Sequence, residues 1–117
     1  MAWEDFDKKY LTEDKEPVIS ITKYQRIYIS KSCYEKFLKD RKYIKLLFDR
    51  EKNLIGIKPI GEKRDNSYSL IRRGEQQQIS ISASAFLRHY GIETEVTKKY
   101  LAKWNEEDRL IEINLNQ

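Results

Sequence analysis

The feature that most constrains the fold of this chain is an internal repeat. The stretch IYISKSCYEKF at Ile27–Phe37 and the stretch ISISASAFLRHYG at Ile79–Gly91 both run from alternating isoleucines, through a serine-containing corner, into a helix-like segment. An offset of 52 residues aligns them without a gap, and an offset of 56 then places Leu54–Ile57 on Leu110–Ile113. A repeat of this order predicts that one supersecondary unit occurs twice in a single fold.

Each copy is predicted to contain two strands, a short helix and two further strands. In the first copy, VISIT and YQRIYIS alternate apolar and polar residues on either side of a connection at Thr22–Gln25, which is typical of a β-hairpin. Ser32, with Glu35 three residues later, matches a capping box and predicts the start of the helix. The next hairpin has a polar turn at Asp49–Asn53, and Pro59 is expected to end its second strand.

The repeat also predicts the domain organisation. Residues 1–17 form an acidic arm or a short amphipathic helix, and residues 18–117 form one domain, with repeats at about 18–60 and 68–115 and a polar linker at 61–67. A copy of roughly 45 residues is too small to bury its apolar strand faces alone. We therefore expect a mainly β fold in which both copies close one barrel with short helices about a pseudo-twofold axis. Such a chain is a monomeric pseudo-dimer or forms a homodimer of barrels.

Basic charge is concentrated in the first copy. Residues 1–17 carry three lysines and six acids, residues 18–60 carry eleven lysines or arginines and four acids, and residues 61–117 carry nine of each. The net charges of the three segments are therefore −3, +7 and zero, within a total of +4. Such a basic segment suits an anionic partner such as nucleic acid, while lysines and arginines on helix faces also serve solubility.

The inventory of reactive residues argues against an enzyme. Cys33 is the only cysteine and His89 the only histidine, which excludes an internal disulfide and a Cys/His zinc site within one chain. We expect Cys33 to be a small core residue and His89 to be a packed or half-buried helix residue. The four glycines are scattered, and none builds a phosphate-binding loop after a strand. We predict no catalytic residues, no metal site and no cofactor.

The chain also lacks the marks of a membrane or secreted protein. It contains no apolar run near the roughly 18 residues that a membrane helix needs. Its start, MAWEDFDKKY, has neither the basic end nor the apolar centre of a signal peptide. We expect a cytoplasmic protein without a membrane partner.

The segment QRIYISKSCYEKFLKDRKYIKLLFDREKNLIGIKP resembles part of the AbrB/SpoVT/MazE-type transcription factors. Their motif is Gly-Arg-apolar-x-Ile-Pro, followed by a helix and an apolar hairpin with an acidic turn. Arg26 matches the motif arginine, and Asp49 with Glu51 matches the acidic turn. Gln25 replaces the glycine and Ser30 replaces the proline. The resemblance implies an AbrB-like swapped-hairpin barrel, present here as a tandem duplication of two ββαββ repeats in one chain.

The resemblance further implies DNA binding through the connection between the first two strands of each copy and the start of the second strand. The matching residues of this chain are Lys23, Tyr24, Arg26, Arg72, Arg73, Gln76 and Gln78. About a pseudo-twofold axis the two loops are expected to lie side by side. Their cations would contact phosphates, and their glutamines would contact base edges. The expected function is a transcription regulator that contacts duplex DNA.

A protein-interaction module, such as an antitoxin-like inhibitor or an adaptor, is the alternative. Trp3, Phe6 and Tyr10 are spaced by three and four residues, so an N-terminal helix would carry one aromatic stripe that docks into a partner protein. Tyr24 and Tyr28 share one face of a predicted strand, where tyrosines either stack on single-stranded nucleic acid or pack across strands.

Overall fold

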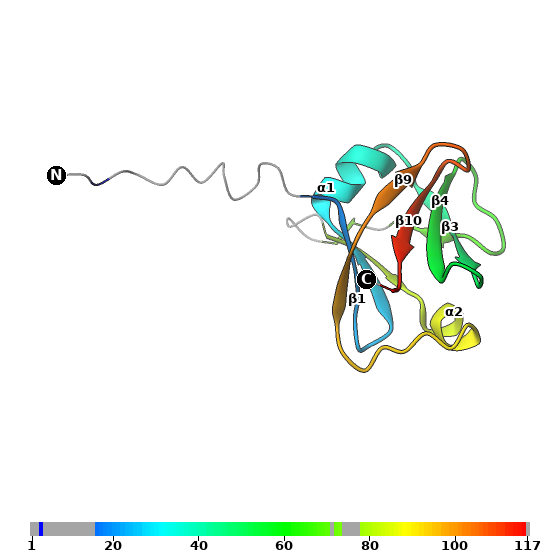
Figure 1. Cartoon of the computed structure of the whole chain (residues 1–117). Helices are drawn as coiled ribbons and strands as arrows, with labels where there is room; N and C mark the ends of the chain where they lie inside the picture. The colour runs from blue at the N-terminus through cyan, green and yellow to red at the C-terminus, as the bar shows by residue number, and fades with distance from the viewer. Residues whose placement is uncertain (1–2, 4–15, 71, 74–77, 117) are drawn as a thin grey trace.

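The computed structural model describes Trp3 and residues 16–70, 72–73 and 78–116. It is mainly β, with two antiparallel sheets and few helices, as the alternating pattern predicts. Figure 1 shows the strands around a common core, with α1 near the top of the view and α2 near the bottom. Within the described ranges, no helix has the length and apolar character needed to cross a lipid bilayer.

The first sheet, which we call sheet A, has the strand order β6–β7–β2–β1–β8, with antiparallel neighbours. Its strands are β1 (Val18–Ile21), β2 (Arg26–Ile29), β6 (Arg72–Arg73), β7 (Gln78–Ser82) and β8 (Lys98–Leu101). Buried isoleucines alternate with more exposed residues along β1, β2 and β7. Since side chains alternate across a strand, one face of sheet A covers the core and the other faces outward.

The second sheet, sheet B, has the strand order β5–β3–β4–β10–β9, again antiparallel. Its strands are β3 (Tyr43–Asp49), β4 (Leu54–Ile60), β5 (Tyr68–Ser69), β9 (Lys103–Asn105) and β10 (Leu110–Asn114). The acidic turn between β3 and β4 is held by Asp49, whose Oδ1 accepts hydrogen bonds from the backbone N–H groups of Glu51 and Lys52, each at 3.0 Å. The predicted hairpin and turn are confirmed.

The expectation that Pro59 ends the second strand of this hairpin is wrong. β4 continues to Ile60, and Pro59 lies opposite Ile44 of β3. On its other side, the pairing of β4 with β10 runs only from Leu54 to Ile57. Pro59 therefore occupies a stretch of β4 with one neighbouring strand, where a missing N–H can face away from the ladder.

The helix of the first copy begins two residues earlier than the capping box predicts. Helix α1 (Lys31–Cys33) continues as a π-helix, η2 (Tyr34–Leu38). The N-cap is Ser30, whose Oγ accepts hydrogen bonds from the N–H of Cys33 at 3.1 Å and of Val18 at 3.0 Å. The prediction that Ser32 is the cap is wrong because the Ser30 hydroxyl accepts hydrogen bonds both from the start of the helix and from β1.

The helix of the second copy is α2 (Ser84–His89). It ends at Gly91, which has φ +65° and so takes the left-handed conformation that glycine tolerates best. The N–H of Ile92 bonds to the carbonyl of Leu87 at 2.9 Å, and that of Gly91 bonds to the carbonyl of Arg88 at 3.2 Å. These two bonds form a Schellman motif that stops the helix.

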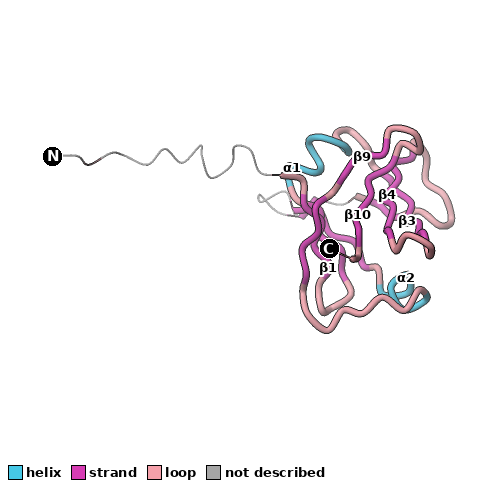
Figure 2. Tube along the Cα trace, viewed as in Figure 1, coloured by secondary structure: helices cyan, strands magenta, loops and turns pink. Residues whose placement is uncertain are grey.

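The chain passes from one sheet to the other at two places, and these connections join the edges of sheet A to the edges of sheet B. Residues 68–69 pair with β3 in sheet B as β5, and residues 72–73 pair with β7 in sheet A as β6. Residues 98–105 pair first with β1 in sheet A as β8 and then with β10 in sheet B as β9. Figure 2 shows β9 running alongside β10 after leaving sheet A. The antiparallel pairing thus closes into a ring around the core.

The register of the ring matches the repeat in the sequence. In the pairing of β2 with β7, Tyr28 lies opposite Ser80, 52 positions later. In the pairing of β4 with β10, Gly56 lies opposite Glu112, 56 positions later. These separations equal the two offsets that align the copies. Each of these residues therefore faces its own counterpart across a strand pair.

The core lies inside this ring and draws on both copies. Its fully buried isoleucines come from six strands: Ile19, Ile27, Ile29, Ile44, Ile55, Ile57, Ile79, Ile111 and Ile113 are nearly inaccessible to solvent. Leu38 from η2 and Leu87 from α2 are buried as well. The halves share one apolar interior, which agrees with the argument that a single copy is too small to build one.

Candidate nucleic-acid interface

The connection between β1 and β2 is a short loop fixed by its own threonine. Thr22 Oγ1 accepts hydrogen bonds from the N–H groups of Tyr24 and Arg26, each at 3.2 Å. Gln25 has φ +62°, the left-handed conformation that favours glycine, and its N–H bonds to the Thr22 carbonyl at 3.0 Å.

This loop is also tied to neighbouring segments. The carbonyl of Gln25 accepts a hydrogen bond from the N–H of Ala83 at 3.0 Å, and the N–H of Lys23 donates to Thr97 Oγ1 at 3.3 Å. The Tyr24 side chain is 74% exposed, and Lys23 Nζ lies 5.3 Å from the centroid of its ring. The loop thus presents a cation and an aromatic ring to solvent on a fixed backbone.

Arg26 is held on the outer side of sheet A. It is the first residue of β2, directly after the loop, and its Nη2 donates a hydrogen bond to Ser80 Oγ at 2.7 Å. The guanidinium is half-buried, and only one of its five N–H groups is used by this bond. The remaining donors are available to an anion while the side chain stays in place.

The outward positions of sheet A form a surface that we call the hydroxyl face. Lys99, Ser20, Tyr28 and Ser80 form one row across β8, β1, β2 and β7, because each lies opposite the next in the strand pairing. Arg26 and Ser82 form the row beside it. The hydroxyl face is defined by these residues: Ser20, Arg26, Tyr28, Ser80, Ser82 and Lys99.

The electrostatics of this face differ from those of the other sheet. At the outward positions of sheet A that the structure describes, no residue is Asp or Glu. The corresponding outer face of sheet B includes Asp49 opposite Leu54 and Glu112 opposite Lys103. A surface with cations and hydroxyl donors but without carboxylates attracts phosphate with little opposing repulsion.

The two strand-connecting loops were expected to lie side by side, but the described strand ends that lead into them do not. Because β2 and β7 are antiparallel, Arg26 at the start of β2 lies opposite Ser82 at the end of β7. Gln78 begins β7 at the other end and pairs with Arg73 of β6. At about 3.3 Å per residue, the starts of the two strands are separated by roughly 13 Å along the sheet. Lys23, Tyr24 and Arg26 are therefore not brought together with the backbone of Arg72, Arg73 and Gln78, and Gln76 lies outside the described residues.

Of the aromatic residues proposed for a protein partner, only Trp3 is described. Its side chain is 86% exposed. Phe6 and Tyr10 lie outside the described residues, so the predicted stripe stays a prediction.

The single cysteine and histidine behave differently from each other. Cys33 is buried, and this burial raises the pKa of its thiol to about 12, so it is an unreactive core residue as expected. His89 is exposed on α2, so it is not half-buried, but its ring packs edge-on against that of Tyr90, as the alternative of a packed helix histidine predicts. In the part of the chain that is described, no three His, Cys, Asp or Glu residues are grouped as a metal site.

Reasoning from the sequence missed Ser20, Ser80, Ser82 and Lys99. The signal that marks the serines is the alternation ISIS, which places Ser80 and Ser82 on the strand face opposite Ile79 and Ile81. Lys99 joins this face only through the pairing of β8 with β1, which sequence spacing does not reveal.

Comparisons with protein-family models, curated proteins and solved structures find no match for this chain. The functional interpretation therefore depends on the residues and geometry described above.

Proposed function

We propose that this protein binds duplex DNA through the hydroxyl face and the adjoining loop between β1 and β2. The observation that carries the proposal is an outer sheet face that has no carboxylate among its described residues, on which Arg26 is fixed by its hydrogen bond to Ser80. Lys99 lies on β8, an edge strand of sheet A, and Lys23 lies in the loop between β1 and β2. Backbone pairing fixes where these side chains leave the sheet, and the hydrogen bond to Ser80 also restricts the side chain of Arg26.

The physical basis is contact with phosphates. Lys and Arg contacts to the DNA backbone release condensed counterions and supply most of the non-specific affinity. Hydroxyl groups of Ser and Tyr are common donors to phosphate oxygens and set the register of the protein on the duplex. The exposed ring of Tyr24 is then the described group of the loop that would reach bases. A role in transcription regulation is what the resemblance to AbrB-like factors implies.

We further propose that the fold is a tandem duplication in the manner of a swapped-hairpin barrel. In the ring, the first strand of each copy pairs with the third strand of the other: β1 with β8, and β5 with β3. The second strands pair with each other, as do the fourth strands. This arrangement is the one expected if two copies of one unit exchange hairpins about a twofold axis.

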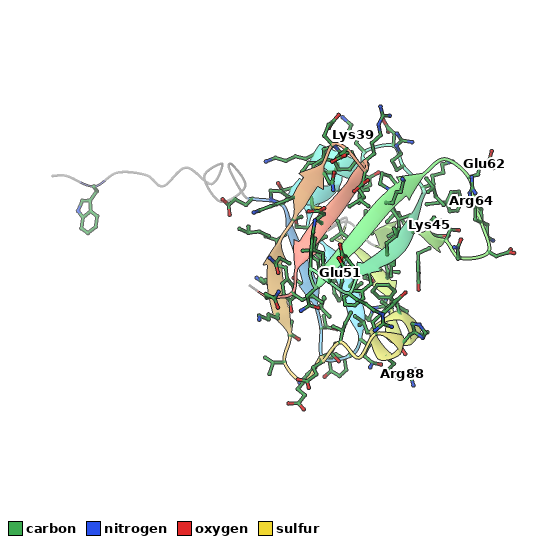
Figure 3. The ribbon with its side chains drawn as sticks, turned by 45° about the vertical axis from the view of Figure 1, so that its right-hand side comes forward. Lys39, Lys45, Glu51, Glu62, Arg64 and Arg88 are labelled. Carbon is green, nitrogen blue, oxygen red and sulfur yellow. The ribbon has the colours of Figure 1, made fainter. Side chains whose placement is uncertain are left out.

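The DNA proposal is tested by fluorescence anisotropy of a labelled duplex over a series of salt concentrations. The variant Arg26→Gln with Lys99→Gln is expected to lower the slope of log affinity against log salt by about 2, because two phosphate contacts are lost. The matched control is Lys39→Gln with Arg88→Gln, which removes the same charge from two exposed positions, the C-cap of η2 and helix α2. The labelled positions of Lys39 and Arg88 lie at opposite ends of the molecule in Figure 3.

Equal slopes for the two double variants would refute the hydroxyl face as the binding surface. Tighter binding to a single strand than to the duplex would favour stacking on Tyr24 and overturn the duplex proposal.

Removal of residues 1–15 should leave DNA affinity unchanged or increase it, because this segment is acidic. An adaptor that uses Trp3, Phe6 and Tyr10 would lose its partner with the same truncation.

The duplication is tested with a polypeptide of residues 1–60. If the second and fourth strands pair with their own counterparts, this polypeptide should form a homodimer in which Tyr28 faces Tyr28 and Gly56 faces Gly56. Sedimentation velocity gives its mass, and circular dichroism gives its strand content. An unfolded polypeptide or a folded monomer would contradict the proposed exchange of hairpins.

A further inference from the structure

A groove outside the hydroxyl face has several ring-bearing residues in its lining. It has a volume of about 570 Å³ and lies between the turn that precedes β5, the strand β3 and the helix α2. Its ring-bearing residues are Tyr68, Phe86, His89 and Tyr90, and Leu46 adds an aliphatic side chain. No residue of the hydroxyl face lines it.

The rings meet at steep angles instead of stacking. Phe86 and Tyr90 have centroids 5.1 Å apart and planes inclined by 63°, and His89 meets Tyr90 at 4.7 Å and 86°. In such edge-to-face contacts the two rings of a pair lie in different planes, so the rings that line the groove are inclined to one another around it. Such an arrangement suits a compact cation, which is attracted to the electron-rich faces of aromatic rings.

The face of Tyr90 is already a cation partner within the protein. The guanidinium carbon of Arg50 lies 5.0 Å from the centroid of the Tyr90 ring. Arg50 is not among the residues that line the groove, so it does not fill the space beside Phe86 and Tyr68.

The groove has one formally charged side chain in its lining, the carboxylate of Asp65. Asp65 lies in a turn that is closed by Arg64 and Ser67. The Ser67 Oγ accepts from the Arg64 N–H at 2.9 Å and donates to the Arg64 carbonyl at 2.7 Å, and the Ser67 N–H bonds to the same carbonyl at 3.0 Å. Within the described residues, the Asp65 carboxylate makes no hydrogen bond or ion pair.

We propose that this groove binds a methylated ammonium group, with the aromatic rings contacting its methyl groups and Asp65 neutralising its charge. A methylated ammonium ion is weakly hydrated and cannot donate hydrogen bonds from a fully substituted nitrogen. It therefore gains most from a site made of ring faces and one carboxylate, and little from the hydroxyl-rich surface of sheet A. In Figure 3, the labelled Arg64 and Arg88 show the two sides of this region, the turn before β5 and the helix α2.

The full-length protein tests the proposal by calorimetry and by amide chemical shifts. Choline is the probe, and 3,3-dimethylbutan-1-ol, which has the same shape without the charge, is its matched control. Choline should bind and shift the amides of Asp65, Phe86 and Tyr90, while the neutral alcohol should bind at least fivefold more weakly. A trimethyl-lysine peptide, compared with its unmethylated form, then distinguishes a side-chain ligand from a free small molecule.

Two variants separate the contributions of the site. Asp65→Asn removes an exposed charge without a buried contact, and it should weaken choline binding about threefold. Phe86→Leu keeps an apolar side chain but removes the ring face, and it should weaken choline binding at least fivefold. Asp40→Asn, at an exposed position after η2, is the control and should bind like the parent protein.

Equal binding of choline and the neutral alcohol, or no shift at the three amides, would overturn the proposal. So would an unchanged affinity in Asp65→Asn. Neither result bears on DNA binding, because Asp65 and Phe86 are not part of the hydroxyl face.

Discussion

The ring of Phe37 stacks on the ring of Trp104, with centroids 5.6 Å apart and planes inclined by 12°. Phe37 belongs to the helical segment of the first copy, and Trp104 belongs to β9 of the second. A related contact joins Phe48 of β3 to Tyr90 at the end of α2, with centroids 4.7 Å apart. In both contacts, an aromatic residue near the helix of one copy packs against a strand residue of the other.

We expect Phe37→Leu to lower the free energy of unfolding by about 1 kcal/mol, because the ring contact with Trp104 is lost while apolar volume is largely kept. Phe48→Leu should have a similar effect through the contact with Tyr90. Urea unfolding followed by circular dichroism gives both values. Because each contact links the two copies, both variants should still unfold in one transition.

The control is Glu35→Ala, at an exposed position of the same helical segment, which should change stability by less than about 0.5 kcal/mol. Two separate transitions in the parent protein would contradict the shared core, since they would mean that the copies unfold independently.

Ser30→Ala should cost about 1–2 kcal/mol of stability. The substitution removes one acceptor from two backbone N–H groups, those of Cys33 and Val18, and leaves the helix start without its cap. The thermal unfolding midpoint, measured by circular dichroism, should fall accordingly.

Ser82 offers the matched control, because the 52-residue offset places it on Ser30. Its side chain is exposed and makes no hydrogen bond within the described part of the chain, and α2 has no side-chain cap. Ser82→Ala should leave the midpoint nearly unchanged. Equal losses in the two alanine variants would show that Ser30 does not act through its two hydrogen bonds.

The elements of this fold could be predicted from local patterns. Alternating isoleucines located β1, β2 and β7, and the polar stretches located the turn after Asp49 and the connection after Ile60. The errors arose where tertiary contacts decide. Ser30 caps α1 because its hydroxyl also accepts a hydrogen bond from Val18, and β4 passes through Pro59 because its pairing with β10 extends only as far as Ile57.

The candidate site was predictable only in part. Arg26 and the loop at Thr22–Gln25 were located from the sequence, but their surroundings depend on which strands become neighbours. An antiparallel pairing of β2 with β7 puts the starts of these two strands at opposite ends of the pair and places Ser80 beside Arg26. No spacing within either copy carries that information, because it is a property of the contact between the copies.

Cys33 should be inert in the native protein and should make stability depend on alkaline pH. Burial raises the pKa of its thiol from 9.0 to about 12, so the native state keeps the proton in a range where the unfolded state loses it. Stability from this source is therefore complete below about pH 9 and falls as the pH rises toward about 12. Burial also raises the pKa of Tyr100, which acts in the same direction.

The measurements are thiol titration and urea unfolding. A thiol reagent at about pH 8 should react with Cys33 only after denaturant is added. Cys33→Ala should lose about 1 kcal/mol at neutral pH, from lost packing, and should show a weaker fall in stability at alkaline pH than the parent protein. Rapid reaction of the native thiol would mean that Cys33 is not enclosed by the core.

Placing a carboxylate on the hydroxyl face should weaken DNA binding without disturbing the fold. Ser82 is the position of choice, because it is exposed, lies opposite Arg26 and has no side-chain partner among the described residues. An added negative charge beside Arg26 and a bound phosphate should weaken the binding free energy by about 1 kcal/mol, so Ser82→Glu should reduce affinity about fivefold in low salt. The loss should shrink as salt is added.

Ser69→Glu adds the same charge at an exposed position of β5 in sheet B and should leave affinity within a factor of about two. If the two glutamate variants bind DNA equally well, the duplex does not lie against the face that Ser82 and Arg26 share.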